Sequence, residues 1–509
     1  MYKNLLSVGG LTLLSRGTGF LRDVLFAAAF GSGLIAEAYL VAFRLPNHFR
    51  TIFGEGAFSA AYVPCYAQVL ESQGKEEAGR FCSQVAALLL TSQIVVLILA
   101  WIYMPTLVDW LAPGFRDDPE KFSLTVTLTR ITFPYLLFIT LVTLQSGTLN
   151  AHGRFVAAAC TPILMNLTMI ATFAIAMHFS NPGVVAALGI TLSGVLQYLL
   201  TAGAAYRLGI LESPTWPKLT KNVRHFLLTL GPAVIGSAGV QIALFADTII
   251  ASLLPGGIAS ITYADRLYQL PVGIIGIAAG TVLLPEMSRL RAAGKPEAAL
   301  HAQNRTMALT IALSAPFCIA FLTIPDLIMR GVFLRGAFTS ADAAASARVL
   351  AAYGLGLMAI VLIRSALASF QAEADTKTPM IVSLIAVASN VCLKLVLFEP
   401  LGAAGLATAT AAGAWINLTL LFLLATRRGT MQPDRLLWKT VACVSAASLA
   451  LALFARLAME PVVAWSAGLP FLRNETALIG LSLAGALLYG AIVFAGLRFA
   501  GVSLKLRRR

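Results

Sequence analysis

Long apolar stretches recur along this 509-residue chain and constrain its fold more than any other feature. Each stretch is close to the roughly 20 residues that an α-helix needs to cross the hydrocarbon core of a bilayer. The chain is 58% apolar and only 12% charged, about half the charge of a typical soluble protein. We therefore predict an all-α polytopic membrane protein with about fourteen transmembrane helices, at residues 5–30, 35–62, 84–104, 126–149, 160–179, 184–206, 226–253, 261–287, 305–325, 347–370, 380–398, 402–425, 437–458 and 476–499.

The charges of the loops predict how these helices are oriented. An even number of spans places both termini on one side, and the segments on that side carry roughly 22 lysines and arginines. Because basic residues accumulate on the cytoplasmic side of membrane proteins, both ends of the chain are expected in the cytoplasm. Basic residues in the cytoplasmic loops and tail then account for the net charge of +14, so this charge does not indicate a nucleic-acid partner, and none is expected. The opposite loops carry about five basic residues, namely Arg116, Lys121, Arg330, Arg335 and Arg473.

A weak internal repeat predicts two similar halves. Residues 20–33 resemble residues 244–257 at a spacing of about 222, which aligns Asp23 with Asp247. A repeat of six spans keeps its orientation, so the halves would be related by a pseudo-two-fold axis along the membrane normal, and transporters commonly bind substrate between such halves. The predicted organisation is an N-terminal six-helix lobe, a second six-helix lobe, and two further helices with a basic cytoplasmic tail, at residues 1–210, 222–430 and 431–509.

The stretch from Ser15 to Pro64 is apolar enough to form two membrane helices, yet it carries seven charged side chains. A charge near the centre of a span costs roughly 2.5 to 3.5 kcal/mol, so seven lipid-facing charges would cost on the order of 20 kcal/mol. Pro46 is expected to kink or break the second helix. Most of the charges are expected to face a water-filled cavity or one another; they are Arg16, Arg22, Asp23, Glu37, Arg44, Arg50 and Glu55.

The second half of the chain has intramembrane charges of its own. Asp265 and Arg266 lie early in the eighth span, and Asp247 and Lys394 lie in the seventh and eleventh. One interpretation of all these charges is that they form buried ion pairs that only lock helices together. The other is a binding cavity, which the excess of arginine favours. A guanidinium group stays charged when desolvated and binds phosphate oxygens through a planar fork, so such a cavity suits an anionic, phosphate-bearing substrate.

Motifs for other chemistries are missing from the sequence. The six cysteines show no CxxC spacing and the five histidines form no HExxH pair, so neither a metal nor a cofactor is expected. There is no Walker motif for ATP. A membrane enzyme acting on a lipid would need catalytic carboxylates or histidines outside the membrane, but the longest loop opposite the termini, about 105–125, offers only scattered charges. We therefore expect a transporter, not an enzyme.

Four segments carry a resemblance to a known family. The first two are SRGTGFLRD at 15–23 and the long, specific motif AFRLPNHFRTIFGEGAFSAAYVP at 42–64. The others are YADRLYQLPVGIIGIAAGTVLLPEMS at 263–288 and DTKTP at 375–379. The sequence resembles the MurJ (MviN) family of flippases for lipid II, in the multidrug/oligosaccharidyl-lipid/polysaccharide exporter (MOP) superfamily, over nearly the whole chain.

The resemblance implies a multi-pass protein of the bacterial cytoplasmic (inner) membrane that serves peptidoglycan synthesis, cell-wall biogenesis and cell shape. Its substrate would be lipid II, an undecaprenyl-diphosphate-linked disaccharide-pentapeptide. Alternating access between the two lobes would carry lipid II from the cytoplasmic to the periplasmic leaflet, and the last two spans would form a groove for the polyprenyl tail. Besides lipid II and membrane lipids, we expect a monomeric transporter that works with cell-wall synthesis proteins.

The same resemblance assigns roles to individual residues. Some members of the family are described with a sodium site between spans seven and eleven, but here Lys394 follows Asn390 by one turn and would repel the ion. A structural pair of Asp247 with Lys394 is expected instead. Substrate-binding roles fall on Arg16, Arg22, Arg50, Arg266 and Asn47, to which the arginine excess adds Arg44. Gating or ion-pair roles fall on Glu37, Glu55 and Asp265, to which the charge pattern of the first span adds Asp23.

Two other transport functions stay open. A drug/cation antiporter of the same superfamily should have an acidic and aromatic cavity, whereas arginine predominates in the charged stretch of this chain. A flippase for another polyprenyl-linked saccharide, such as an O-antigen unit, would handle a similar diphosphate, and only the 42–64 motif argues against it.

Overall fold

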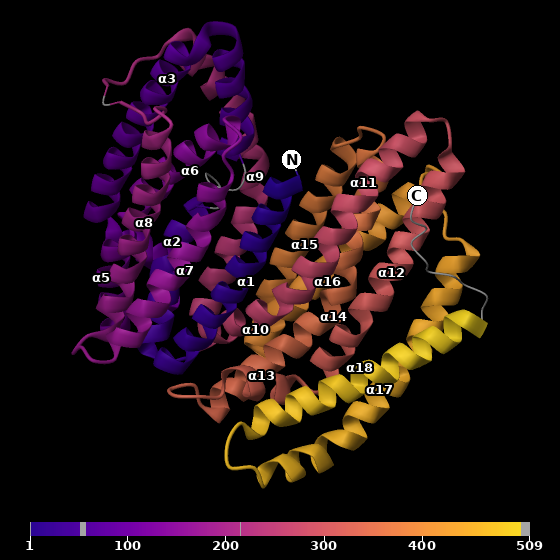
Figure 1. Ribbon diagram of the computed structural model, residues 1–509. Coiled ribbons are helices and arrows are strands. Elements are labelled where there is room, and N and C mark those ends of the chain that lie inside the picture. Colours follow the sequence, from indigo (N-terminus) through magenta and orange to yellow (C-terminus); the bar gives the residue numbers. More distant parts are fainter. Residues whose placement is uncertain (1, 51–56, 214, 500–509) are drawn as a thin grey trace. The chain divides into compact units, whose positions relative to one another are not determined.

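The computed structural model describes residues 2–50, 57–213 and 215–499. Helices make up 87% of the structure, and the described residues contain no strand. The predicted all-α fold class is therefore confirmed (Figure 1).

The helices follow one another with short connections. The N-terminal part of the chain forms α1 (Tyr2–Phe30), α2 (Leu34–Arg50), α3 (Ala57–Ile102), α4 (Met104–Leu111), the short η2 (Pro113–Phe115), α5 (Pro119–Thr132), α6 (Tyr135–Ala151), α7 (Val156–Ala176), α8 (Pro182–Arg207) and α9 (Lys221–Ser252). The remainder forms α10 (Gly257–Pro271), the single π-turn η3 (Val272–Gly276), α11 (Ile277–Ala292), α12 (Pro296–Thr323), α13 (Pro325–Phe333), α14 (Ser340–Gln371), α15 (Lys377–Leu401), α16 (Ala403–Arg427), α17 (Arg435–Ala467) and α18 (Arg473–Phe499).

Eleven segments in the described part of the chain are long and apolar enough to cross a membrane. Each of them corresponds to one predicted span, so the polytopic class is confirmed, whereas the number fourteen stays a prediction. The other three predicted spans, 5–30, 35–62 and 226–253, are occupied by α1, by α2 with the start of α3, and by α9. Within α2 the helix continues past Pro46 to Arg50, so the proline does not break it.

Contacts divide the chain into two compact units, each described here by itself. Unit 1 comprises Met1–Ile258 and Gly336–Phe338, and unit 2 comprises Ala259–Arg335 and Thr339–Arg509. By contacts α9 belongs to unit 1, where it packs against α3, and α17 and α18 belong to unit 2, where α17 packs against α12. The two lobes predicted from the repeat, 1–210 and 222–430, stay a prediction, because a division by contacts does not test whether two halves have similar structures.

The helix α3 consists of two arms that fold back on each other. Gly74 has φ 85° and ψ 177°, a non-helical conformation that only glycine adopts readily. The rings of Tyr62 and Phe81 stack with their centroids 5.9 Å apart, although a straight helix would separate them by about 28 Å. The chain therefore reverses at Gly74, and the arms pack on α6 and α9.

Aromatic rings pack α1, which carries Arg22, against α2 and α7. The Phe26 ring of α1 lies 5.0 Å from Tyr39 of α2 and 5.4 Å from Phe173 of α7. Aromatic pairs at such distances add to the stabilisation that burial provides. Because Arg22 precedes Phe26 by one turn on the same face of α1, this packing also fixes the position of Arg22.

Unit 2 is organised around α14, which packs against α12 and α16 and is buried along much of its length. Its first turn is closed by a capping box, in which the Thr339 hydroxyl and the Asp342 carboxylate bond each other's backbone N–H groups. Small residues permit close approach of the helices, as where Gly356 faces the backbone of Ala411 on α16. The helices α17 and α18 form a hairpin, yellow in Figure 1.

Candidate functional site

Arg22 and Asp23 form an ion pair on α1 within unit 1. The Nη2 and Nε atoms of Arg22 lie 2.6 and 3.0 Å from Oδ1 of Asp23. Only 12% and 14% of the two side chains are exposed. The third recorded contact runs to α7, where Nη1 of Arg22 donates to Oδ1 of Asn166 at 3.0 Å. The predicted arginine is therefore held from two helices and does not project freely.

Asn166 was missed in the sequence analysis, although it holds both Arg22 and the backbone of α1. Its Nδ2 donates to the carbonyl of Ser15 at 3.1 Å and to Oγ1 of Thr18 at 3.2 Å. The side chain is 6% exposed. A signal was present in the sequence, because an asparagine in the middle of the apolar run ILMNLTMI has to find partners inside the protein.

The other predicted arginines of unit 1 lie along α1 and α2. Arg16 is exposed on α1, and Arg44, Asn47 and Arg50 lie half-buried at successive three-residue spacings near the end of α2. Nε of Arg50 donates to Oδ1 of Asn47 at 3.2 Å, which joins two of the predicted substrate-binding residues. Glu55 lies outside the described residues.

Glu37 is one of the few buried acidic groups, with 2% of the residue exposed. Its carboxylate forms an ion pair with Lys121 at the start of α5. The other carboxylate oxygen accepts the backbone N–H of Ile258, at the first turn of α10, at 3.1 Å. Lys121 also lies over the ring of Phe115, 4.0 Å from its centroid. The sequence had assigned Lys121 only to a loop, so the partner of Glu37 was not predicted.

The predicted residues of unit 2 are distributed over two helices. Asp265 and Arg266 are half-buried on α10, and Oδ1 of Asp265 accepts Nε2 of Gln269 at 3.3 Å. Lys394 on α15 is only 1% exposed. Its predicted partner Asp247 is half-buried on α9, which belongs to unit 1, and their pairing stays a prediction.

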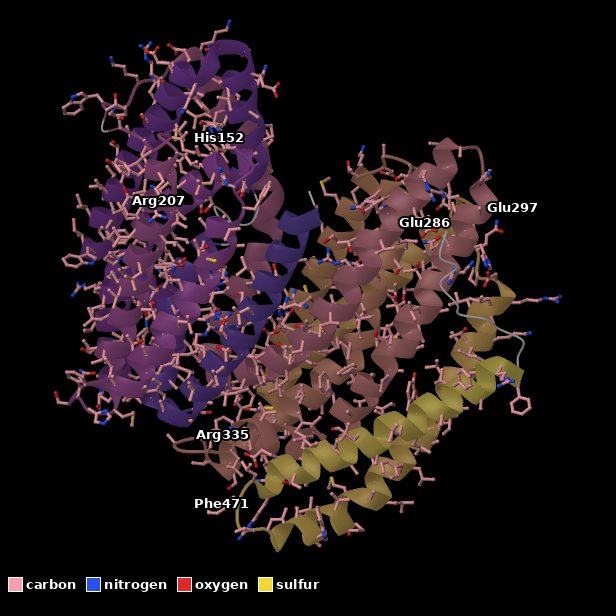
Figure 2. The ribbon with its side chains drawn as sticks, in the orientation of Figure 1. His152, Arg207, Glu286, Glu297, Arg335 and Phe471 are labelled. Atoms are coloured by element: carbon pink, nitrogen blue, oxygen red, sulfur yellow. The ribbon has the colours of Figure 1, made fainter. Side chains whose placement is uncertain are left out.

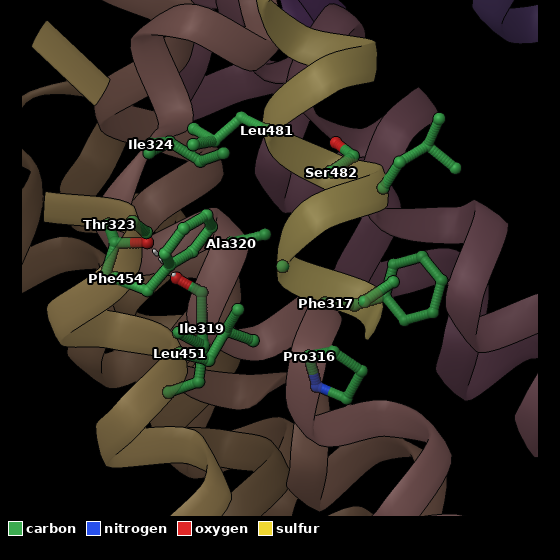
Figure 3. A pocket seen from close by; sticks show the side chains of 14 residues that line it. Pro316, Phe317, Ile319, Ala320, Thr323, Ile324, Leu451, Phe454, Leu481 and Ser482 are labelled. Atoms are coloured by element: carbon green, nitrogen blue, oxygen red, sulfur yellow. Dashed lines mark hydrogen bonds between the residues drawn. The ribbon is translucent and has the colours of Figure 1, made fainter. Parts of the chain in front are cut away.

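An apolar cavity of about 410 Å³ lies within unit 2 between α12, α17 and α18. Figure 3 shows Ile319 of α12 beside Phe454 and Leu451 of α17, with Phe317 of α12 on the other side of the view. Its surface is almost entirely hydrocarbon, so it suits an alkyl or polyprenyl chain rather than a polar group. No group of three potential metal-ligating side chains occurs within the described residues.

The fold defines the class of protein. It resembles an inward-facing multidrug resistance MATE-family transporter of the MOP superfamily with a TM-score of 0.67, at 16% identity over 81% of this chain and 94% of that one. It resembles a lipid II flippase MurJ in an inward closed conformation more closely, with a TM-score of 0.81 and 25% identity over 97% of this chain and 99% of that one. The chain is thus a polytopic helical protein with the fold of the MOP transporters.

The sequence comparisons show the family. The family described as lipid II flippase MurJ matches residues 26–474, and this chain belongs to it. A probable lipid II flippase MurJ of Rhizobium meliloti (strain 1021) is 42% identical over 84% of this chain and 81% of its own. The lipid II flippase MurJ of Burkholderia cenocepacia is 34% identical over 85% of both chains. A probable member of Rickettsia prowazekii is 32% identical over 94% of this chain and 92% of its own. As their names state, these relatives are flippases, which are transporters and not enzymes.

Proposed function

We propose that this protein moves lipid II from the cytoplasmic to the periplasmic leaflet of the bacterial inner membrane. Membership in the MurJ family supports the assignment. The observation that carries it in this chain is the arginine of α1 that an asparagine and an aspartate hold within unit 1. Both termini would lie in the cytoplasm, and the transporter would act as a monomer beside cell-wall synthesis proteins.

The diphosphate of lipid II would bind the arginines. A guanidinium has five N–H donors, and the recorded bonds of Arg22 to Asp23 and Asn166 use three of them. Two donors are left for phosphate oxygens on a group that is already oriented, which lowers the entropy lost on binding. The proposed binding set is completed by other residues with the same chemistry, namely Arg16, Arg44, Asn47, Arg50 and Arg266.

Acidic residues of the proposed site would balance these cations when the substrate is absent. Asp23 does so for Arg22 by direct contact. For Glu37, Glu55 and Asp265 we propose a role in gating during alternating access. The carboxylate of Glu37 would act through Lys121 and the first turn of α10, which are its partners in this structure.

The apolar cavity between α12, α17 and α18 would hold part of the polyprenyl tail. A tail of this kind needs hydrocarbon contact along its length, and burial of each CH₂ contributes about 0.8 kcal/mol. In this proposal arginines bind the diphosphate of lipid II, and a separate apolar cavity binds part of its polyprenyl tail.

The test is the leaflet position of lipid II in cells that depend on this protein. Changing Arg16, Arg22, Arg50 or Arg266 to Ala should stop lipid II from reaching the periplasmic face while the protein stays in the membrane. Lys at the same position should rescue poorly wherever the contact is bidentate, because an ammonium cannot reproduce the fork. Arg207→Ala is the control, since this arginine is exposed in the last turn of α8 (Figure 2). Normal lipid II export with all four arginines changed to Ala, at matched expression, would contradict the proposal.

A further inference from the structure

A second, polar cavity lies within unit 1, away from the charged face of α1. It has a volume of about 760 Å³ and lies between the turn of α3 and residues 208–213 and 215–220, which follow α8 and precede α9 and are called the strap below. Its lining is rich in polar and basic groups, including Tyr66, Lys75, Arg80, Ser83, Gln84 and Lys218. None of these residues belongs to the proposed transport site.

Side-chain contacts hold the strap against the turn of α3. The backbone N–H of Ser213 donates to Oγ of Ser83 at 2.9 Å, and Oγ1 of Thr220 donates to Oε1 of Gln84 at 2.7 Å. Nζ of Lys75 donates to the carbonyl of Leu208 at 3.5 Å. Hydrogen bonds therefore hold both sides of the cavity, the turn of α3 and the strap, in place.

The turn itself is tied down as well. The side-chain amides of Gln73 and Asn222 bond each other reciprocally, at 3.4 and 3.1 Å, and connect the turn to the start of α9. The hydroxyl of Tyr66, which lines the cavity, forms a hydrogen bond of 3.0 Å with Nε2 of His152, labelled in Figure 2. Hydrogen bonds thus hold residues on both sides of the cavity in place.

Cations outnumber carboxylates at the cavity by one. Arg80 forms ion pairs with both Glu76 and Glu77, which leaves one negative charge in this group, and Lys75 and Lys218 add two positive charges to the lining. Within the described residues Lys75 donates to the Leu208 carbonyl, and Lys218 forms no ion pair. An ammonium group has three N–H donors, so the two lysines offer about five donors to one cavity. Two cations with several donors around a polar space of this size are suited to a phosphate group.

The surroundings favour a ligand from water. The exposed side chains around the turn of α3, from Glu71 to Arg80, are charged or polar. The lipid-compatible surface of the same helix, with Ile94, Ile98 and Ile102 exposed, begins further along its second arm. From Lys75 to Ile94 a helix rises about 28 Å, so the cavity lies near one end of the bundle and not beside the hydrocarbon.

We propose that this cavity is a binding site for a phosphate-bearing anion, distinct from the transport site. Bound phosphate would join Lys75 on the turn of α3 to Lys218 on the strap. It would thereby stiffen the connection between α8 and α9, and the ligand would regulate the protein without being transported. The phosphate could belong to a soluble phosphate ester or to a lipid headgroup, and the test separates these sources.

The test is thermal unfolding of the purified full-length protein with glycerol phosphate as the probe. A ligand that binds only the folded state raises its melting temperature, here by about 2 °C or more at saturation. The double variant K75Q/K218Q should lose this shift. Lys221→Gln is the matched control, because Lys221 is exposed one residue after the strap and the change removes the same charge. Lys221→Gln should retain the full shift.

Two further measurements show whether the bound phosphate comes from a lipid headgroup. Nanodiscs of phosphatidylglycerol and of phosphatidylcholine are compared without soluble phosphate. A shift that appears only with phosphatidylglycerol and disappears in K75Q/K218Q assigns the phosphate to a lipid headgroup at the same site. The proposal is overturned if no phosphate probe raises the melting temperature, or if the shift is equal in the wild type and in K75Q/K218Q.

Discussion

Buried charges in unit 1 have partners contributed by other helices, and those partners decide what each charge does. Arg22 is oriented by Asn166 from α7, and Glu37 is neutralised by Lys121 from α5. In the proposed function, the two N–H donors of Arg22 that these contacts do not use would bind the diphosphate. The carboxylate of Glu37, in contrast, bonds Lys121 and the first turn of α10. The two charged residues therefore have different partners, although both lie in the same charged stretch.

The pair of Glu37 with Lys121 should be strongly stabilising relative to either partner alone. Their side chains are 2% and 13% exposed, so Glu37→Ala or Lys121→Ala leaves a buried charge without its partner. We expect each single change to lower the free energy of unfolding by about 3 to 5 kcal/mol, and the double change to recover much of that loss. Thermal unfolding of the purified variants measures both.

The ion pair of Asp109 with Arg116 is the control for this experiment. The Arg116 side chain is 65% exposed, so water can solvate it when its partner is removed. Changing Asp109 to Ala should leave the melting temperature almost unchanged. A double variant of Glu37 and Lys121 whose loss equals the sum of the two singles would contradict the pairing.

At the scale of elements, one glycine determines the shape of α3. Gly74 lies in a polar stretch between the two arms of α3, where the chain reverses. The packing of Tyr62 against Phe81 and of both against Phe226 on α9 stabilises the reversed arrangement. Residues that follow this turn, from Lys75 to Arg80, line one side of the polar cavity.

Two glycine-to-alanine changes in α3 should therefore have opposite effects. At Gly74, with φ 85° and ψ 177°, a Cβ strains the backbone, so Gly74→Ala should destabilise by about 1 to 3 kcal/mol. Gly79 is helical, and a Cβ there meets open space. Gly79→Ala should stabilise by about 0.5 to 1 kcal/mol, because alanine loses less entropy in a helix. Melting temperatures of the two variants that move in the same direction would contradict the role of Gly74.

At the scale of the whole molecule, the orientation in the membrane is predicted from the side on which basic residues collect. In unit 2, Nη1 of Arg428 lies 2.6 Å from Oδ2 of Asp375, so the start of α15 and the end of α16 lie at the same end of the unit. Hydrogen bonds from Thr378, together with one from Arg428, hold the pKa of Asp375 well below its usual range. The pair therefore stays ionised at any pH at which the cell grows.

Reporter fusions test this orientation. Fusions after Arg428 and after Arg509 should both report the cytoplasm, because basic residues concentrate at those ends. A fusion after Glu399 should report the periplasm, since α15 rises about 33 Å between its start at Lys377 and Glu399. Periplasmic signals at either of the first two positions would contradict the predicted topology.

The sequence by itself determined the class of this protein. Runs of about 20 apolar residues require membrane-spanning helices because backbone groups must be satisfied inside the bilayer. The same physics identified the intramembrane charges of α1 and α2, since each would be too costly facing lipid. The prediction of paired or solvated charges therefore needed no structure, and neither did the resemblance carried by the 42–64 motif.

Only the tertiary structure decided which groups meet. Glu37 and Lys121 are 84 residues apart, and Arg22 and Asn166 are 144 apart. No local pattern encodes such a separation, because partner choice depends on how helices pack. The reversal at Gly74 falls in a polar stretch between two predicted spans, but only the structure shows that Tyr62 on one arm stacks on Phe81 of the other. Membrane spans can be predicted from the hydropathy of a single segment, whereas the residues of a binding site come from several segments and are known only once their packing is known.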